Sequence, residues 1–310
     1  MSQLTQRFQN IFQLQDHYFE IIGCGAIGSY AAMNLARAGA TKFELWDPDT
    51  VDPVNIGVQH YDLTHIGNSK VKMLSKQMSA INPNVEIDTF RQKFNANTRR
   101  RFWHSVSDEQ YREKKVFIII GIDNMEGRKQ IVEDIISLSK THRYPNYYIK
   151  GKYTKYHTFI IDGRMGSETF QMYHWELIPD EIADSIKRKR EEINNIQLAN
   201  RALGWNNSTS EERDANNNQI DNLKMRIKYL NEQALRNFQA NYLETWYSDE
   251  DGDSEPCNAR STNYCASMAG AFINNQVRKL VDPRSPSNTN LVFNFPAMAL
   301  KCDTNYNLNK

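Results

Sequence analysis

The stretch HYFEIIGCGAIGSYAAMNLARAG, residues 17–39, decides the fold of this chain. It opens with a short apolar run, Tyr18 to Ile22, that predicts a buried strand. Three glycines follow in the spacing G-x-G-x-x-G: Gly23, Gly25 and Gly28. Alanines and a leucine at helical spacing then predict a helix, and a second apolar run, 42–46, ends directly before Asp47. This order predicts an α/β, Rossmann-like fold with a doubly wound, mostly parallel sheet and helices on both faces.

The glycine turn has the chemistry of a phosphate-binding loop. Gly23 and Gly25 allow backbone angles that a Cβ would oppose, and they let the chain approach a phosphate closely. The amides at the start of the next helix point at that phosphate. Asp47 stands about 20 residues past Gly28, where a carboxylate meets a ribose diol. We therefore expect a bound nucleotide; the alternative is a tight turn needed only for packing.

A long polar segment after Asp47 indicates which nucleotide is bound. A dinucleotide dehydrogenase has no need for this segment, which carries Asn55 and Gln59 and leads to Lys70. Lys70 stands near the start of a predicted helix, 69–81, and supplies a point charge for a triphosphate. One such lysine by itself is typical of a solvated surface group, so the ordered set is what favours ATP.

A third predicted strand, 116–120, runs into a loop that contains Asp123 and Asn124. A carboxylate at the C-terminal end of a parallel strand faces the edge where ligands bind. Asp123 is therefore the candidate to hold Mg²⁺, directly or through water. The alternative is a helix cap, and both hold if Asn124 caps the helix while Asp123 faces the ligand.

Four segments, in this order, resemble the ThiF/MoeB/HesA family of adenylyltransferases, which are related to ubiquitin-activating enzymes: GCGAIG, DPDTVDPVNIGVQ, IGNSK and IDNMEGR. The resemblance is good over residues 15–135 and loose over 140–175 and 255–282, and it is closest in kind to standalone bacterial or virus-encoded members. It implies binding of ATP and Mg²⁺ and attack of a carboxylate on the α-phosphate, which yields an acyl adenylate. The carboxylate is usually the C-terminus of a ubiquitin-like or sulfur-carrier protein.

The resemblance also implies roles for the candidate residues. The three glycines hold the phosphates, Asp47 holds the ribose and Asp123 serves Mg²⁺. Further contacts to the phosphates come from three polar side chains: Asn55, Gln59 and Lys70. The family commonly has an arginine where this chain has Val58. Some members use an arginine from the N-terminal segment of a partner subunit in a homodimer; Arg7 is the candidate here, with an ordinary surface arginine as the alternative.

The four cysteines include no C-x-x-C pair, so we predict neither a disulfide scaffold nor a structural zinc. Family members that transfer the adenylated carboxylate to a thioester use a cysteine in a mobile segment. Cys257, close to Arg260, is the candidate nucleophile, because a cation favours the thiolate; a structural cysteine is the alternative. Cys24 and Cys265 are expected to be packed.

The back half predicts a helical hairpin, 179–247, inserted between two parts of the ATP-binding domain, 1–178 and 248–310. Aliphatic residues recur in steps of three and four within it, as in a narrow coiled-coil seam. A clamp for a partner protein or a dimer contact is the expected role. Before the hairpin, Arg164 and Glu168 either line the site or form an ion pair beside a turn.

The charge balance excludes some classes of protein. The 38 basic and 37 acidic residues give a net charge of +1, which argues against a nucleic-acid-binding body. No stretch approaches the roughly 18 apolar residues of a membrane span, and we expect a cytoplasmic protein, in the host cytoplasm if virus-encoded. Two alternatives stay open: an NAD-dependent oxidoreductase of the same fold, and a non-catalytic nucleotide-binding scaffold.

Overall fold

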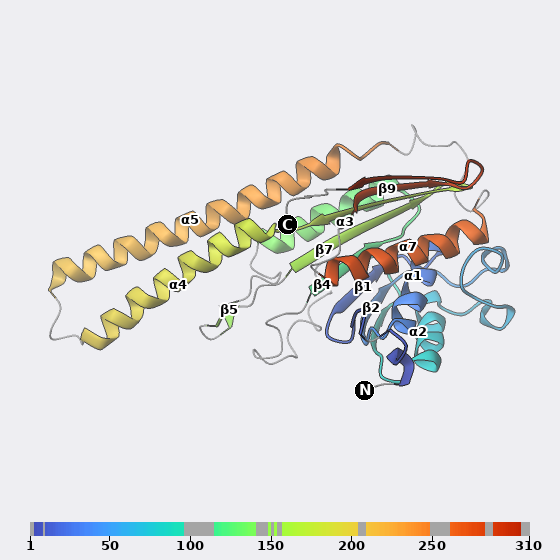
Figure 1. Cartoon of the computed structure of the whole chain (residues 1–310), viewed down its shortest axis with the longest axis horizontal. Coiled ribbons are helices and arrows are strands. Elements are labelled where there is room, and N and C mark those ends of the chain that lie inside the picture. The colour runs from blue at the N-terminus through green and yellow to red at the C-terminus, as the bar shows by residue number, and fades with distance from the viewer. Residues whose placement is uncertain are drawn as a thin grey trace.

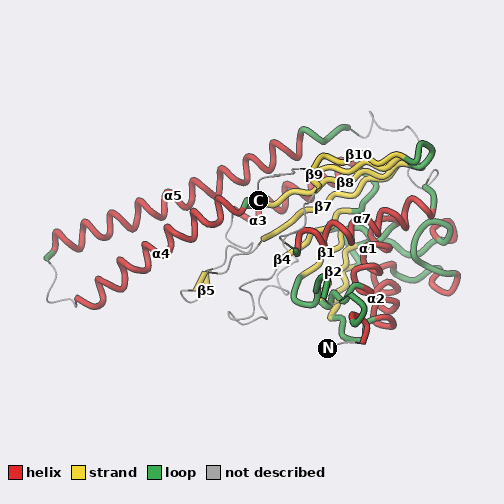
Figure 2. The backbone as a smooth tube through the Cα atoms, in the orientation of Figure 1, coloured by secondary structure: helices red, strands yellow, loops and turns green. Residues whose placement is uncertain are grey.

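The computed structural model has one large sheet with helices packed on both faces (Figures 1 and 2). It describes residues 3–8, 10–95, 115–140, 148–149, 152–153, 157–203, 209–248, 261–282 and 288–304. The order of the eight strands is β10-β9-β8-β7-β4-β1-β2-β3. The strands from β7 to β3 pair in parallel, and β8, β9 and β10 extend the sheet by antiparallel pairing. The predicted fold class is confirmed.

The strands of the large sheet begin and end as follows: β1 Tyr18–Ile22, β2 Lys42–Trp46, β3 Glu86–Phe90, β4 Lys115–Ile120, β7 His157–Met165, β8 Thr169–Glu176, β9 Asn288–Asn294 and β10 Ala299–Thr304. A separate small pair is formed by β5 (Tyr148–Ile149) and β6 (Lys152–Tyr153). The strands predicted from the first two apolar runs are confirmed at both ends.

The helices of the described residues are α1 Ala26–Arg37, α2 Lys70–Ile81, α3 Met125–Lys140, α4 Asp180–Leu203, α5 Ser210–Leu243 and α7 Asn263–Val281. Short 3-10 turns occur at η1 Gln3–Thr5, η2 Pro53–Asn55 and η3 Leu63–His65. None of these helices is long and apolar enough to cross a membrane.

Two hydrophobic cores lie on opposite faces of the sheet, because successive side chains of a strand point to opposite sides. One core joins alternate residues of the central strands, such as Phe19 and Phe117, to α1, α2 and α7. The other joins the intervening residues, such as Ile118, to α3 and to Phe238 and Tyr242 near the end of α5. The central strands are thus buried on both sides, as expected for a parallel sheet.

Helices α4 and α5 form a long antiparallel hairpin that extends away from the sheet (Figure 1, left). Its seam buries Ile186, Ile193 and Ile220. Polar pairs bridge the helices beside it: Asn216 Nδ2 donates to Asn200 Oδ1 at 2.7 Å, and Gln219 Nε2 donates to Glu192 Oε1 at 3.1 Å. The last turns of α5 belong to the second core, so the hairpin is anchored in the body. The division of the chain into domains stays a prediction.

Candidate functional site

The glycine turn lies at the C-terminal edge of the sheet, where the strand order reverses. β1 lies between β2 and β4, and all three strands are parallel. The chain passes from β1 to β2 on one side and later returns to β4 on the other. In open α/β sheets, ligands bind outside the carboxyl ends of the strands at such a switch point. The fold therefore places the turn where a ligand is expected.

The three glycines of the turn are required for different reasons. Gly23 has φ +89°, a left-handed conformation that favours glycine. A Cβ on Gly28 would lie 1.8 Å from the carbonyl oxygen of Gly23, so α1 packs directly on the turn. A Cβ on Gly25 would meet only Gln59 Nε2, at 3.9 Å. The backbone above Gly25 thus borders open space, as a phosphate-binding turn requires.

Asp47 is buried directly beneath the turn. Its Oδ2 accepts a hydrogen bond from Cys24 N at 2.7 Å, and its Oδ1 accepts one from Asp49 N at 2.8 Å. Burial raises the pKa of Asp47 above its usual value, while the Lys70 ammonium and the two N–H donors act in the opposite direction. Hydrogen bonding therefore fixes the Asp47 carboxylate at the glycine turn, beside which the sequence predicted it to lie.

Lys70 is the first residue of α2, and its side chain is 8% exposed. The ammonium donates to Asp49 Oδ2 at 3.0 Å, and the side chain of Asp49 is 61% exposed. Burial raises the pKa of both Asp47 and Cys24, and Lys70 lies close enough to both groups that its positive charge opposes this rise. The structure thus brings Lys70, whose acidic partner Asp49 is open to solvent, to the border of the turn together with Asp47.

Two buried polar atoms near these residues have no hydrogen-bond partner among the described residues: Gln59 Oε1 and Ser69 Oγ. An unpaired buried polar atom costs about 1–3 kcal/mol, so it calls for an explanation. Asn55 differs, because its Oδ1 accepts from Asp52 N at 2.9 Å and closes a capping box around η2. The open space above Gly25 is faced by the donor Gln59 Nε2, and the Ser69 hydroxyl and the Lys70 ammonium can also donate, so these groups fit the polyphosphate of a nucleotide. Gln59 Oε1 can only accept, so it suits a hydroxyl group or a bound water.

The loop that follows Asp47 is held over the turn by two hydrogen bonds. Tyr61 Oη donates to Cys24 O at 2.8 Å, and His60 N donates to Ser29 Oγ at 3.0 Å. These bonds join the loop to the turn and to α1, which explains how Gln59 comes to face Gly25. Val58, in the position where the family commonly has arginine, is partly buried.

Asp123 is exposed in the loop between β4 and α3. Its neighbour Asn124 accepts a hydrogen bond from Gly127 N at 2.7 Å, which confirms that Asn124 caps α3. Among the described residues, no three His, Cys, Asp or Glu side chains gather as metal ligands. Mg²⁺ is usually held by one or two carboxylates together with substrate phosphates and waters. Asp123 therefore fits an ion bound jointly with a nucleotide.

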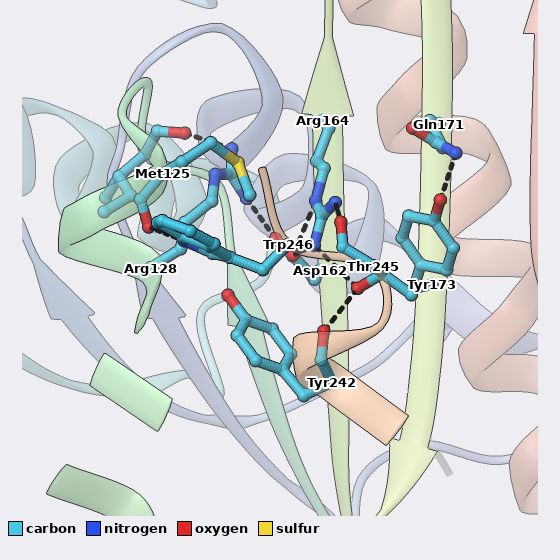
Figure 3. A network of polar contacts seen from close by, with 10 residues as sticks. Met125, Arg128, Asp162, Arg164, Gln171, Tyr173, Tyr242, Thr245 and Trp246 are labelled. Atoms are coloured by element: carbon cyan, nitrogen blue, oxygen red, sulfur yellow. Dashed lines mark hydrogen bonds and ion pairs between the residues drawn. The ribbon is translucent and has the colours of Figure 1, made fainter. Parts of the chain in front are cut away.

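Sequence reasoning did not include Asp162, the central group of a buried network in the same edge of the sheet (Figure 3). Asp162 is fully buried in β7, level with Ile120 of β4. Its Oδ1 pairs with Arg128, and its Oδ2 accepts from Arg164 Nε at 2.9 Å. Arg164 forms an ion pair with Asp162, not with Glu168, the partner that the sequence suggested. The sequence did contain a signal for this network, the charged residues Asp162 and Arg164 within the apolar run FIIDGRM. A buried Asp is nearly always paired.

Arg7 is not brought to the other candidates in its own chain. It is exposed and lies two residues from Thr5, whose side chain packs against Gly39 after the end of α1. Because α1 has 12 residues, it carries the chain about 18 Å away from the glycine turn. Arg7 is thus at the opposite edge of the sheet from Gly25.

The cysteines have different surroundings. Cys24 and Cys265 are buried, as expected, and burial raises the pKa of Cys265 to about 11. Cys257, the candidate nucleophile, lies outside the described residues. Glu168, the other candidate near Arg164, accepts a hydrogen bond from the hydroxyl of Tyr264.

A doubly wound sheet with a glycine turn at its switch point, an acid after β2 and a lysine at the start of α2 defines a Rossmann-like α/β protein. The ThiF family model matches residues 7–301. The chain therefore belongs to the ThiF family.

Two curated relatives illustrate the sequence similarity. Ubiquitin-like modifier-activating enzyme 5 of Dictyostelium discoideum is 31% identical over 143 residues, which are 44% of this chain and 36% of that protein. The tRNA threonylcarbamoyladenosine dehydratase of Bacillus subtilis (strain 168) is 32% identical over 91 residues, 29% of this chain and 36% of that protein. The chain thus matches just over a third of the length of these relatives.

Solved structures show the same fold. E. coli MccB superposes with a TM-score of 0.53 at 11% identity, covering 98% of this chain and 69% of that chain. Its structure with AMPCPP and MccA gives a TM-score of 0.51 at 12% identity, covering 97% and 66%. At these identities the likeness shows the fold alone.

Proposed function

We propose that this chain is an ATP- and Mg²⁺-dependent adenylyltransferase that activates the carboxylate of a small protein or peptide as an acyl adenylate. The observation that carries the proposal is the set of groups around the open space above Gly25. Gln59 Nε2, a donor, faces Gly25, the hydroxyl of Ser69 is buried with no partner among the described residues, and Lys70 lies at the border of the turn. Family membership and the ubiquitin-activating relatives support the same class of chemistry.

The residues of the site match the charge changes of the reaction. A carboxylate oxygen of the acceptor bonds to the α-phosphorus, the bond from that phosphorus to the bridging oxygen breaks, and pyrophosphate leaves. Catalysis of such a transfer consists mostly of positioning and of neutralising the developing negative charge. Lys70 supplies a fixed positive charge beside the phosphates, and the N-terminal amides of α1 supply donors at the glycine turn. Asp47 holds the ribose hydroxyls.

Asp123 is the residue that would hold Mg²⁺. When bound with the nucleotide, the ion would neutralise phosphate charge. The exposed position of Asp123 allows direct or water-mediated contact, and Asn124 fixes the loop by capping α3. An ion with no all-protein cage fits the usual mode of Mg²⁺ binding in phosphoryl transfer.

The acceptor is inferred from the names of the relatives. The similarity to ubiquitin-like modifier-activating enzymes favours a ubiquitin-like or sulfur-carrier protein, and the MccB structure with MccA supports a peptide. We further propose a homodimer in which Arg7 serves the partner's site, because Arg7 lies too far from the turn of its own chain. Transfer of the acyl group to Cys257 as a thioester is a possible second step in this scheme.

Pyrophosphate–ATP exchange tests the proposal. The purified protein is incubated with ATP, Mg²⁺ and labelled pyrophosphate in the presence of a ubiquitin-like protein, a sulfur carrier, a peptide or tRNA. We expect exchange that depends on one acceptor with a free carboxylate and that disappears when the acceptor's C-terminus is amidated. Binding of NAD in place of ATP, with no exchange for any acceptor, would overturn the proposal in favour of an oxidoreductase. ATP binding without exchange would favour a scaffold.

A further inference from the structure

The turn that follows α5, residues 244–246, packs against the start of α3. Trp246 Nε1 donates a hydrogen bond to Met125 O at 3.2 Å. The Lys129 ammonium lies 4.8 Å from the centre of the Trp246 ring, within the range of a cation–π contact. The end of the hairpin is therefore attached to the first turn of α3.

A second, buried route joins the same turn to the same loop (Figure 3). Arg164 donates to the backbone oxygen of Thr245 and, at 3.1 Å, to its Oγ1. The guanidinium of Arg164 also pairs with Asp162. On its other oxygen, Asp162 pairs with Arg128, which in turn donates to the backbone oxygen of Ile122.

The two routes end on either side of Asp123, at Ile122 O and at Met125 O. We propose that Thr245 and Trp246, at the hairpin exit, act with the buried Arg164–Asp162–Arg128 chain as positioning residues that fix the loop carrying Asp123. The exit of the hairpin is then part of the site rather than a mere connection. What Asp123 does there rests on the proposed function; that the loop is held from the hairpin does not.

The chemistry of these groups suits positioning better than substrate contact. Arg128, Arg164 and Asp162 are each at most 4% exposed. Within the described residues, they form hydrogen bonds with one another, with the backbone oxygen of Ile122 and with the oxygens of Thr245. Arginine can serve two partners at once because its donors form a rigid fork, which a lysine cannot reproduce. The network can therefore fix the position of one loop relative to the other while its charged groups stay buried.

Hydrogen exchange of the nucleotide-free protein tests the inference directly. The variants are Arg164→Lys, Trp246→Phe and the double variant, with Arg226→Lys as the matched control on the exposed part of α5. We expect amides in residues 121–127 to exchange about three- to tenfold faster in the double variant, in line with loss of one or two hydrogen bonds. Amides in residues 269–277 of α7, on the other face of the sheet, should keep their rates, and Arg226→Lys should change neither region.

Activity supplies a second readout. In pyrophosphate exchange, the double variant should need about three- to tenfold more Mg²⁺ for half-maximal rate, with the KM for the acceptor unchanged. Wild-type exchange rates for residues 121–127 in the double variant, or equal acceleration in α7, would overturn the inference. Faster exchange in residues 121–127 with an unchanged Mg²⁺ requirement would overturn the role that the proposed function gives to Asp123. If Arg164→Lys does not fold, Trp246→Phe alone decides it. If the wild type shows no activity, the proposed function fails, while amide exchange still tests the positioning.

Discussion

Two clusters of polar and charged side chains at the same edge of the sheet differ in how completely their hydrogen-bonding groups are paired within the protein. At the end of β2, Lys70 pairs with an exposed Asp49, and the nearby Gln59 Oε1 is buried without a partner among the described residues. At the end of β7, Asp162 is fully buried between Arg128 and Arg164. The first cluster has hydrogen-bonding groups left to bind a ligand, whereas the second has used its hydrogen-bonding groups within the protein.

This difference separates binding from positioning. A protein tolerates an unpaired buried polar atom when a ligand can satisfy it, and it retains a buried carboxylate only when that carboxylate is paired. Substitutions in the second cluster should therefore act first on stability, and substitutions in the first cluster on ligand binding and rate. The following predictions test this separation.

The largest effect on stability is expected for Asp162→Ala. Removal of the carboxylate leaves two buried guanidinium groups without their acid, which should lower the free energy of unfolding by about 3–5 kcal/mol. Asp49→Ala is the matched control, because it breaks an ion pair whose acid is 61% exposed and should cost at most about 1 kcal/mol. Urea unfolding measures both, and equal losses would remove the distinction between the two clusters.

Lys70→Ala should have the largest effect on rate. Loss of a fixed charge beside the phosphates should slow pyrophosphate exchange by about 100- to 1,000-fold, or ~3–4 kcal/mol of transition-state stabilisation. Lys72→Ala, at an exposed position two residues along α2, should leave the rate within about twofold. A similar loss in both variants would show that general charge, not the placement of Lys70, matters.

Gln59→Leu should have a smaller effect than the preceding variants, and it should weaken ligand binding without lowering stability. It removes a buried oxygen that has no partner, so the free energy of unfolding should stay the same or rise. ATP should bind about three- to tenfold more weakly, as measured by titration calorimetry. Gln77→Leu is the control, because Gln77 Oε1 already has a partner within the protein, His60 Nδ1 at 3.3 Å. Lower stability with unchanged affinity in Gln59→Leu would argue against a ligand role.

The smallest effect is a dependence of stability on pH at Asp47. Burial raises its pKa in the folded protein, so its contribution to stability is fully present below the unfolded value and falls as pH rises through the folded value. The unfolding free energy of the wild type minus that of Asp47→Asn should therefore decrease with rising pH in this range. A difference that increases with pH would mean that the hydrogen bonds and Lys70 outweigh burial.

Local patterns predicted most of the residues that gather at the glycine turn. The apolar runs fixed β1 and β2 to the residue, and the glycines, Asp47 and Lys70 came together because each stands at the end of a neighbouring strand or the start of a helix. Parallel pairing brings such ends to one edge without any knowledge of side-chain contacts.

Long-range partnerships escaped prediction. Arg128 and Asp162 are 34 positions apart, and Arg164 and Thr245 are 81 apart, with the whole hairpin between them. Spacing rules cover pairs within one helix or hairpin, so they cannot connect these residues. Likewise, no local pattern shows that Arg7 lies near the far end of α1.

The central claim is tested most directly by titrating the protein with ATP in the presence of Mg²⁺ and, separately, with NAD. The account predicts that the wild type binds ATP, that Lys70→Ala loses most of this binding while Lys72→Ala keeps it, and that NAD binds to none of the three. Binding of NAD without ATP, or equal affinity for ATP in the two lysine variants, would contradict the account.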